Sequence, residues 1–152
     1  MTATSFPESF ARASIFVDSD ILIRAHAAGP WATRERAAER LRRLWMTRDG
    51  RLSVQVLQEC YLALCRHDGS GEDLAGQAVA SEILRNYESW VVAPETPATI
   101  RRATEIQALA GLPFWNAMIV AAAEQARSGL IWSERLPDRQ LIAGIRILNP
   151  LL

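Results

Sequence analysis

Acidic side chains follow the first apolar run of the chain, where they could act on a bound ligand. Ile15, Phe16 and Val17 are apolar with polar residues on both sides, a pattern typical of a buried strand in a parallel sheet. Asp18 follows directly, and Asp20 lies two residues further on. Open α/β sheets bind ligands outside the carboxyl ends of their strands. We therefore expect Asp18 to be functional, the plainer alternative being that it only caps the next helix.

Other polar side chains could reach the same edge of the sheet. Glu59 lies within an expected helix, and Asn116 lies in the first turn of a later one. The segment after an expected strand at 130–132 adds three candidates, which are Ser133, Glu134 and Asp138. Each of these residues could instead have a purely structural role, as a solvated helix residue, a residue at the start of a helix or a turn residue.

The elements that must position these side chains alternate between strands and helices. Strands are expected at 15–17, 51–53, 90–93, 130–132 and 145–148. Helices are expected at 19–27, 33–48, 54–67, 74–87, 97–110 and 114–127, with a loose lead-in at 1–13, a loop at 68–73 and a long turn at 133–144. This alternation predicts one α/β domain over residues 1–152, with a mainly parallel sheet of about 4–5 strands.

The composition limits the classes of protein to consider. Hydrophobic residues make up 49% of the chain and the formal net charge is zero, which indicates a real core and no global attraction to nucleic acid. Lysine is absent, which excludes a catalytic or P-loop lysine. Two cysteines, Cys60 and Cys65, without metal-type spacing favour a reducing cytoplasm. Neither a signal-peptide pattern nor an apolar run of about 20 residues is found, so we expect no membrane association.

Residues 34–51 form the most basic stretch, with seven arginines against three acidic residues and a net charge of +4. A solvated helix face with salt bridges is the favoured interpretation. The functional alternative is a surface that contacts nucleic-acid phosphates, for which Arg34, Arg42 and Arg43 are the candidates.

Four motifs, in order and over about residues 14–152, resemble the PIN domain, the nuclease fold of VapC-type toxins. Residues 16–23 (FVDSDILI) resemble its opening, and 53–61 (SVQVLQECY) its second motif, with Glu59 at the acidic position. Residues 112–120 (LPFWNAMIV) resemble the third, and 131–140 with 145–150 the fourth motif and the last strand. The resemblance implies a three-layer α/β/α domain.

The resemblance also implies an activity. Members of this family are metal-dependent endoribonucleases, in which Mg²⁺ or Mn²⁺ positions the attacking water and offsets the charge of the leaving oxygen. Asp18 and Glu59 would hold the metal, with Asn116 as a weakened ligand and Asp138 as a further candidate. Ser133 matches a position where the family often has Ser or Thr. The implied partners are RNA, a cognate antitoxin and a second copy of the chain.

Two departures from the family pattern suggest a competing function. Asn116 and Arg135 stand where the family usually has aspartate, which removes two of four acids and adds a cation. A PIN fold without catalysis, acting as an RNA- or protein-binding module, is therefore the alternative. A haloacid-dehalogenase-type phosphatase, suggested by Asp18 and Asp20, fits poorly because a matching acidic pair is missing and residue 22 is Leu.

Overall fold

The structure is a computed structural model that describes residues 14–27, 29–66 and 74–152. The expected lead-in at 1–13 and loop at 68–73 lie outside this range. The described residues contain six helices: α1 (Ser19–His26), α2 (Trp31–Thr47), α3 (Val54–Arg66), α4 (Leu74–Tyr87), α5 (Pro97–Ala110) and α6 (Phe114–Gln125). They also contain six strands: β1 (Ile15–Val17), β2 (Gly50–Ser53), β3 (Val91–Ala93), β4 (Leu130–Trp132), β5 (Leu141–Ile142) and β6 (Ile145–Leu148).

The strands form one sheet in the order β3-β2-β1-β4-β6-β5. All neighbours pair in parallel except β5 and β6, which are antiparallel. The expected α/β class with a mainly parallel sheet is thus confirmed. The additional strand, β5, lies in the segment expected to be a long turn; it has two residues, and it turns into β6 through Ala143 and Gly144, whose φ values are 50° and 79°.

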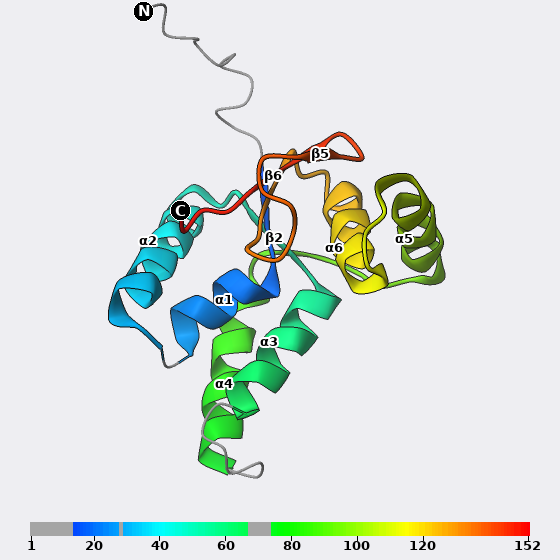
Figure 1. Cartoon of the computed structure of the whole chain (residues 1–152). Coiled ribbons are helices and arrows are strands. Elements are labelled where there is room, and N and C mark those ends of the chain that lie inside the picture. Colours follow the sequence, from blue (N-terminus) through cyan, green and yellow to red (C-terminus); the bar gives the residue numbers. More distant parts are fainter. Residues whose placement is uncertain (1–13, 28, 67–73) are drawn as a thin grey trace, which may run out of the picture.

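Helices cover both faces of the sheet, as the three-layer expectation requires. In Figure 1 the α5–α6 pair lies at the right of the strands and α2 at the left, with α1, α3 and α4 around the lower end. The first helix, α1, begins where β1 ends, and the N-terminal end of α3 lies near it (Figure 1). The starts of α1 and α3 therefore both lie near the carboxyl end of β1.

Local sequence signals explain where α5 begins and ends. Thr96 caps α5 in a capping box with Thr99, and Pro97 occupies the first turn, where its missing N–H has no cost. Gly111 ends the helix with a φ of 68°, a conformation that glycine adopts without strain. The following helix, α6, is buried without interruption from Ala117 to Ala123, which fixes the position of the helix, whereas its first turn, residues 114–116, is only partly buried or exposed.

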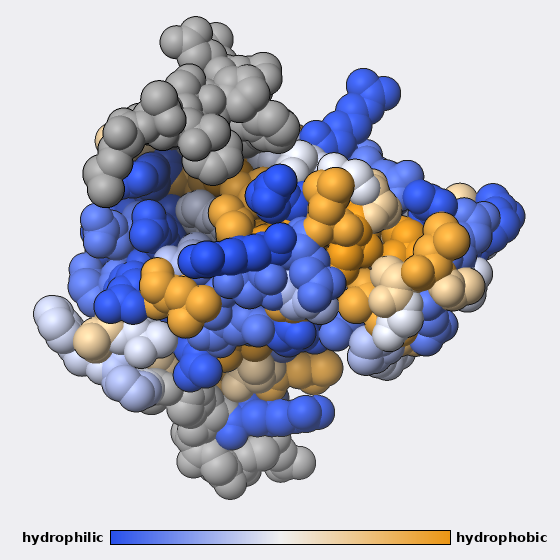
Figure 2. All heavy atoms as spheres, turned by 45° about the horizontal axis from the view of Figure 1, so that its top comes forward, coloured by the Kyte–Doolittle hydropathy of each residue, from blue (hydrophilic) through white to orange (hydrophobic). Residues whose placement is uncertain are grey.

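The surface carries apolar areas among polar ones. The most continuous hydrophobic area in Figure 2 lies on the side of α5 and α6, and exposed apolar residues of α5 and β5 include Leu109 and Leu141. Within the described residues, no single helix has the length and apolarity to cross a membrane. The α5–α6 pair meets that test only when joined across a bend of 115°.

Candidate functional site

Asp18 lies at the carboxyl end of β1, beside the end of β4. Its backbone N–H donates to the Trp132 carbonyl (2.9 Å), and its Oδ1 accepts from the N–H of Ser19 (2.8 Å). The Ser133 hydroxyl donates to Oδ2 (2.8 Å), and both side chains are fully buried. Asp18 therefore caps α1 and at the same time presents a buried carboxylate at the sheet edge.

Glu59 reaches this carboxylate from the second turn of α3. The Ser19 hydroxyl donates to Glu59 Oε2, and Gln55 Nε2 donates to Oε1 (2.9 Å) and to the Trp115 carbonyl (3.3 Å). Burial works against the charged form, but the hydrogen bonds from Ser19 and Gln55 and the charge of Arg135 outweigh it and lower the pKa of Glu59. Glu59 is thus an ionised carboxylate, with the start of α6 beside it.

Arg135 lies between the two carboxylates. Its Nε and Nη2 donate to Asp18 Oδ2 and Oδ1 at 2.9 and 2.8 Å, and Nη2 also donates to Glu59 Oε2 at 2.8 Å. The planar guanidinium matches a carboxylate in this bidentate arrangement. Burial opposes its charge, but the hydrogen bonds and charges of Asp18 and Glu59 raise the pKa of Arg135 above its ordinary value. The site therefore contains its own permanent cation.

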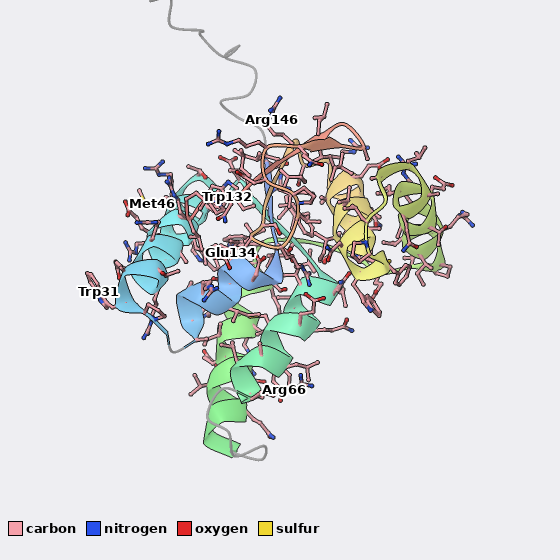
Figure 3. All side chains as sticks on the ribbon, in the orientation of Figure 1. Trp31, Met46, Arg66, Trp132, Glu134 and Arg146 are labelled. Carbon is pink, nitrogen blue, oxygen red and sulfur yellow. The ribbon has the colours of Figure 1, made fainter. Side chains whose placement is uncertain are left out.

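Asp20 holds the loop that carries this arginine. Its Oδ2 accepts from the backbone N–H groups of Glu134 (2.9 Å) and Arg135 (3.0 Å). Its Oδ1 is buried and has no hydrogen-bond partner in the described structure. Burial and the charge of Asp18 raise the pKa of Asp20 to about 7. The Glu134 side chain turns away to Arg24 (3.0 Å) and lies above α1 in Figure 3.

Two predicted metal ligands stay outside this cluster of hydrogen bonds. Asp138 Oδ1 accepts from the N–H of Asn149 (2.7 Å), and its Oδ2 lies 3.5 Å from Arg139. Asn116 follows the Trp115 carbonyl and is half-buried, but no side-chain hydrogen bond of Asn116 is found within the described residues. Of the predicted site residues, the structure therefore brings together Asp18, Glu59 and Ser133, with Asn116 nearby and Asp138 engaged elsewhere.

The three arginines of α2 that are candidates for phosphate contact lie at the surface. Arg34, Arg42 and Arg43 are all exposed, and Arg42 pairs with Glu35 at 3.1 Å. Such an exposed pair is what a solvated helix face would show.

The donor set at Asp18 does not fit the divalent metal ion that the family resemblance implies. Mg²⁺ requires several oxygen ligands in near-octahedral geometry. Here Asp18 and Glu59 direct their oxygens at the guanidinium of Arg135. Across the parts of the chain that the structure describes, no three His, Cys, Asp or Glu residues are grouped so that they could hold a metal ion. The site is arranged around a monovalent, internal cation.

The sequence does not assign three contacts of the candidate site. Arg135 was recognised as a substituted acid but not as the partner of Asp18 and Glu59, and Asp20 was not recognised as the anchor of its loop. Gln55 was missed, although its spacing of four residues from Glu59 on one helix was a usable signal.

Comparisons with known proteins agree with this architecture. The family model described as "PIN domain" matches residues 15–136, which confirms the resemblance to this family over the first three motifs and the start of the fourth. The VapC20 toxin of Mycobacterium tuberculosis, described as cleaving the sarcin–ricin loop, is 21% identical with a TM-score of 0.60, over 88% of this chain and 99% of the toxin. FitAcB from Neisseria gonorrhoeae is 17% identical with a TM-score of 0.59, over 90% and 97% of the two chains. At these identities the two structures show a shared fold, and no curated protein matches the chain.

Proposed function

Because this chain belongs to the PIN domain family, we propose that it is an RNA-binding PIN module in which an internal arginine replaces the catalytic cation. The observation that carries the proposal is the position of Arg135, bidentate on Asp18 and bonded to Glu59. These are the two carboxylates that the family motifs assign to the metal. A nuclease that needs this metal would have to displace a guanidinium held by three charge-assisted hydrogen bonds.

Asn116 supports the same proposal. In the family pattern residue 116 is an aspartate, whereas the amide here contributes no charge. A divalent ion that displaced Arg135 would then meet two carboxylates instead of three or four. Since hard divalent cations are bound mainly through carboxylate oxygens, the neutral residue lowers the metal affinity of the site further.

A metal-dependent, VapC-like endoribonuclease is the competing candidate. It is favoured by the convergence of Asp18, Glu59 and Ser133 at the sheet edge, and by the activity typical of PIN domains. The likeness to a toxin described as cleaving an RNA loop supports RNA as the ligand under either candidate.

The remaining parts of the proposal concern partners and location. A cognate antitoxin and a second copy of the chain are proposed as protein partners, by analogy with toxins of this fold. The free thiols of Cys60 and Cys65 support a reducing compartment, the cytoplasm.

The test is a ribonuclease and RNA-binding assay in millimolar Mg²⁺ or Mn²⁺. The unmodified protein is expected to bind RNA without cleaving it. Restoring two acids with Arg135→Asp and Asn116→Asp is expected to create metal-dependent cleavage, and adding Asp18→Ala to that double variant should abolish the cleavage. Cleavage by the unmodified protein that requires the metal and is lost in Asp18→Ala alone would overturn the proposal in favour of the nuclease.

A further inference from the structure

A hollow lies at the opposite end of the sheet from the acidic site. It is formed by the end of α2, the end of α4 and the starts of β2 and β3, and Arg51 pairs with Val91 where these strands begin. One part has a volume of about 580 Å³, and an adjoining part of about 600 Å³ extends past His26. Both parts have Trp45 and Ser89 in their walls, so they adjoin at these two residues, and we call the two parts together the groove.

The groove has a rigid aromatic wall. The ring centroids of Trp45 and Tyr87 are 5.2 Å apart, and that of Trp90 lies 5.1 Å from both. Trp90 lies directly on Gly50, where a Cβ atom would come within 2.3 Å of the indole. Tyr87 is buried, whereas 37% of Trp45 remains exposed. Trp45 is therefore held in place by its ring contacts, while part of its side chain stays accessible to solvent.

The charge around this wall is positive. Arg48 and Arg51 line one part of the groove and Arg85 the other, and no carboxylate is among the described residues that line either part. Arg51 is positioned by its own backbone neighbours, because its Nη1 donates to the carbonyls of Arg48 (3.4 Å) and Gly50 (3.1 Å). Within the described part of the chain, the one ion pair of Arg85 is a loose and exposed pair with Glu82, at 3.6 Å.

We infer that this groove binds single-stranded RNA, with a base stacked on Trp45 and phosphates held by Arg48, Arg51 and Arg85. Single-strand sites combine aromatic faces, on which unpaired bases stack, with a positive surface that follows the backbone. Both elements are present in the groove, whereas in the acidic site Arg135 is already paired with Asp18 and Glu59. The inference rests on the proposed RNA-binding role and names the surface that performs it.

The experiment is fluorescence anisotropy with a labelled, unstructured 12-nucleotide RNA, in EDTA so that metal-dependent chemistry plays no part. Trp45→Ala is expected to weaken binding roughly tenfold, since each stacked base contributes a factor of this order or more. Trp31→Ala is the matched control, because Trp31 is 75% exposed and lies at the start of the same helix, α2. Trp45 lies at the other end of this helix, next to Met46, which Figure 3 labels far from Trp31. A duplex of the same sequence should bind less tightly than the single strand, because its bases are already stacked.

A second variant guards against loss of aromatic packing in Trp45→Ala. Arg48→Gln combined with Arg85→Gln leaves the three rings intact, and Arg101→Gln, an exposed arginine of α5, is its control. For a single strand, the logarithm of affinity falls with the logarithm of salt concentration by about 0.7 per phosphate contact. The slope of log affinity against log salt concentration should be about −2 in the unmodified protein, with its three arginines, and about −0.7 in the double variant, which keeps one.

The outcomes separate this inference from the proposed function. RNA binding that neither groove variant weakens would overturn the groove and leave the RNA-binding module standing. Failure of the unmodified protein to bind RNA at all would overturn both. A self-associated protein that Trp45→Ala converts to monomers, measured by sedimentation, would show the groove to be an interface between copies and would also overturn the inference.

Discussion

Replacing Arg135 with alanine should make the protein more stable in divalent metal, by a larger amount than metal stabilises the unmodified protein. The substitution removes three hydrogen bonds of 2.8–2.9 Å and leaves the Asp18 carboxylate fully buried. Removing one partner of a fully buried ion pair costs about 3–5 kcal/mol. Because the side chains of Arg135 and Glu59 are 32% and 29% exposed, water offsets part of this cost, and we expect a loss of about 2–3 kcal/mol.

The expected change in melting temperature follows from the size of the chain. At roughly 2–4 °C per kcal/mol, Arg135→Ala should melt about 4–12 °C lower in EDTA. With the guanidinium gone, Asp18 and Glu59 are free to bind a cation that binds only the folded state. A dissociation constant of about 1 mM would return about 1.4 kcal/mol of stability in roughly 10 mM Mg²⁺, or about 3–6 °C.

Thermal melting followed by circular dichroism measures both effects. Arg24→Ala is the matched control, since it removes an exposed pair with Glu134 and should cost less than about 1 kcal/mol. Two results would refute the reasoning. One is an Arg135→Ala variant that is as stable as the unmodified protein, and the other is an unmodified protein that gains as much stability from Mg²⁺ as the variant does.

Three further predictions concern other parts of the molecule. Asn116→Asp should raise Mg²⁺ affinity by calorimetry only in the variant that lacks the arginine, and a rise in the unmodified background would contradict the assignment of the internal cation. Gly50→Ala should cost about 1–3 kcal/mol in denaturant unfolding, because its Cβ would meet the Trp90 ring at 2.3 Å, whereas Gly29→Ala has open space and should be near neutral. Burial lowers the pKa of His26 from its ordinary value of 6.5, so the contribution of His26 to stability is lost as the pH falls through that value, whereas Asp20, with a pKa raised to about 7, contributes a gain over the same range. His26→Gln should therefore gain stability relative to the unmodified protein as the pH falls, and a difference between the two proteins that does not change with pH would contradict this assignment.

The fold was predictable because its signals are local. Caps and breakers such as Pro97 and Gly111 set the helix ends, and short apolar runs such as 15–17 set the strands. The strand β5 was not predictable, since two residues give no periodicity and its pairing depends on the turn at Ala143 and Gly144.

The position of the site was predictable in the same way, but its cation was not. A carboxylate after a buried parallel strand lies at the ligand-binding edge whatever the rest of the chain does. The direction of the Arg135 side chain depends instead on how Asp20 holds the loop through two backbone N–H groups. That contact joins residues more than a hundred positions apart, and no local pattern contains it. The sequence could indicate only that an acid was missing at position 135.

The substitutions at 116 and 135 are best understood as one change. A guanidinium carries a single positive charge, and here it already balances one of the two carboxylates of Asp18 and Glu59. A third carboxylate at 116, on the half-buried turn that Gln55 ties to Glu59, would add repulsion that a monovalent cation cannot offset. With a divalent ion in place of the arginine, the same carboxylate would be attractive. The neutral amide thus matches the internal cation, and the sign of its effect on stability should reverse when that cation is exchanged for Mg²⁺.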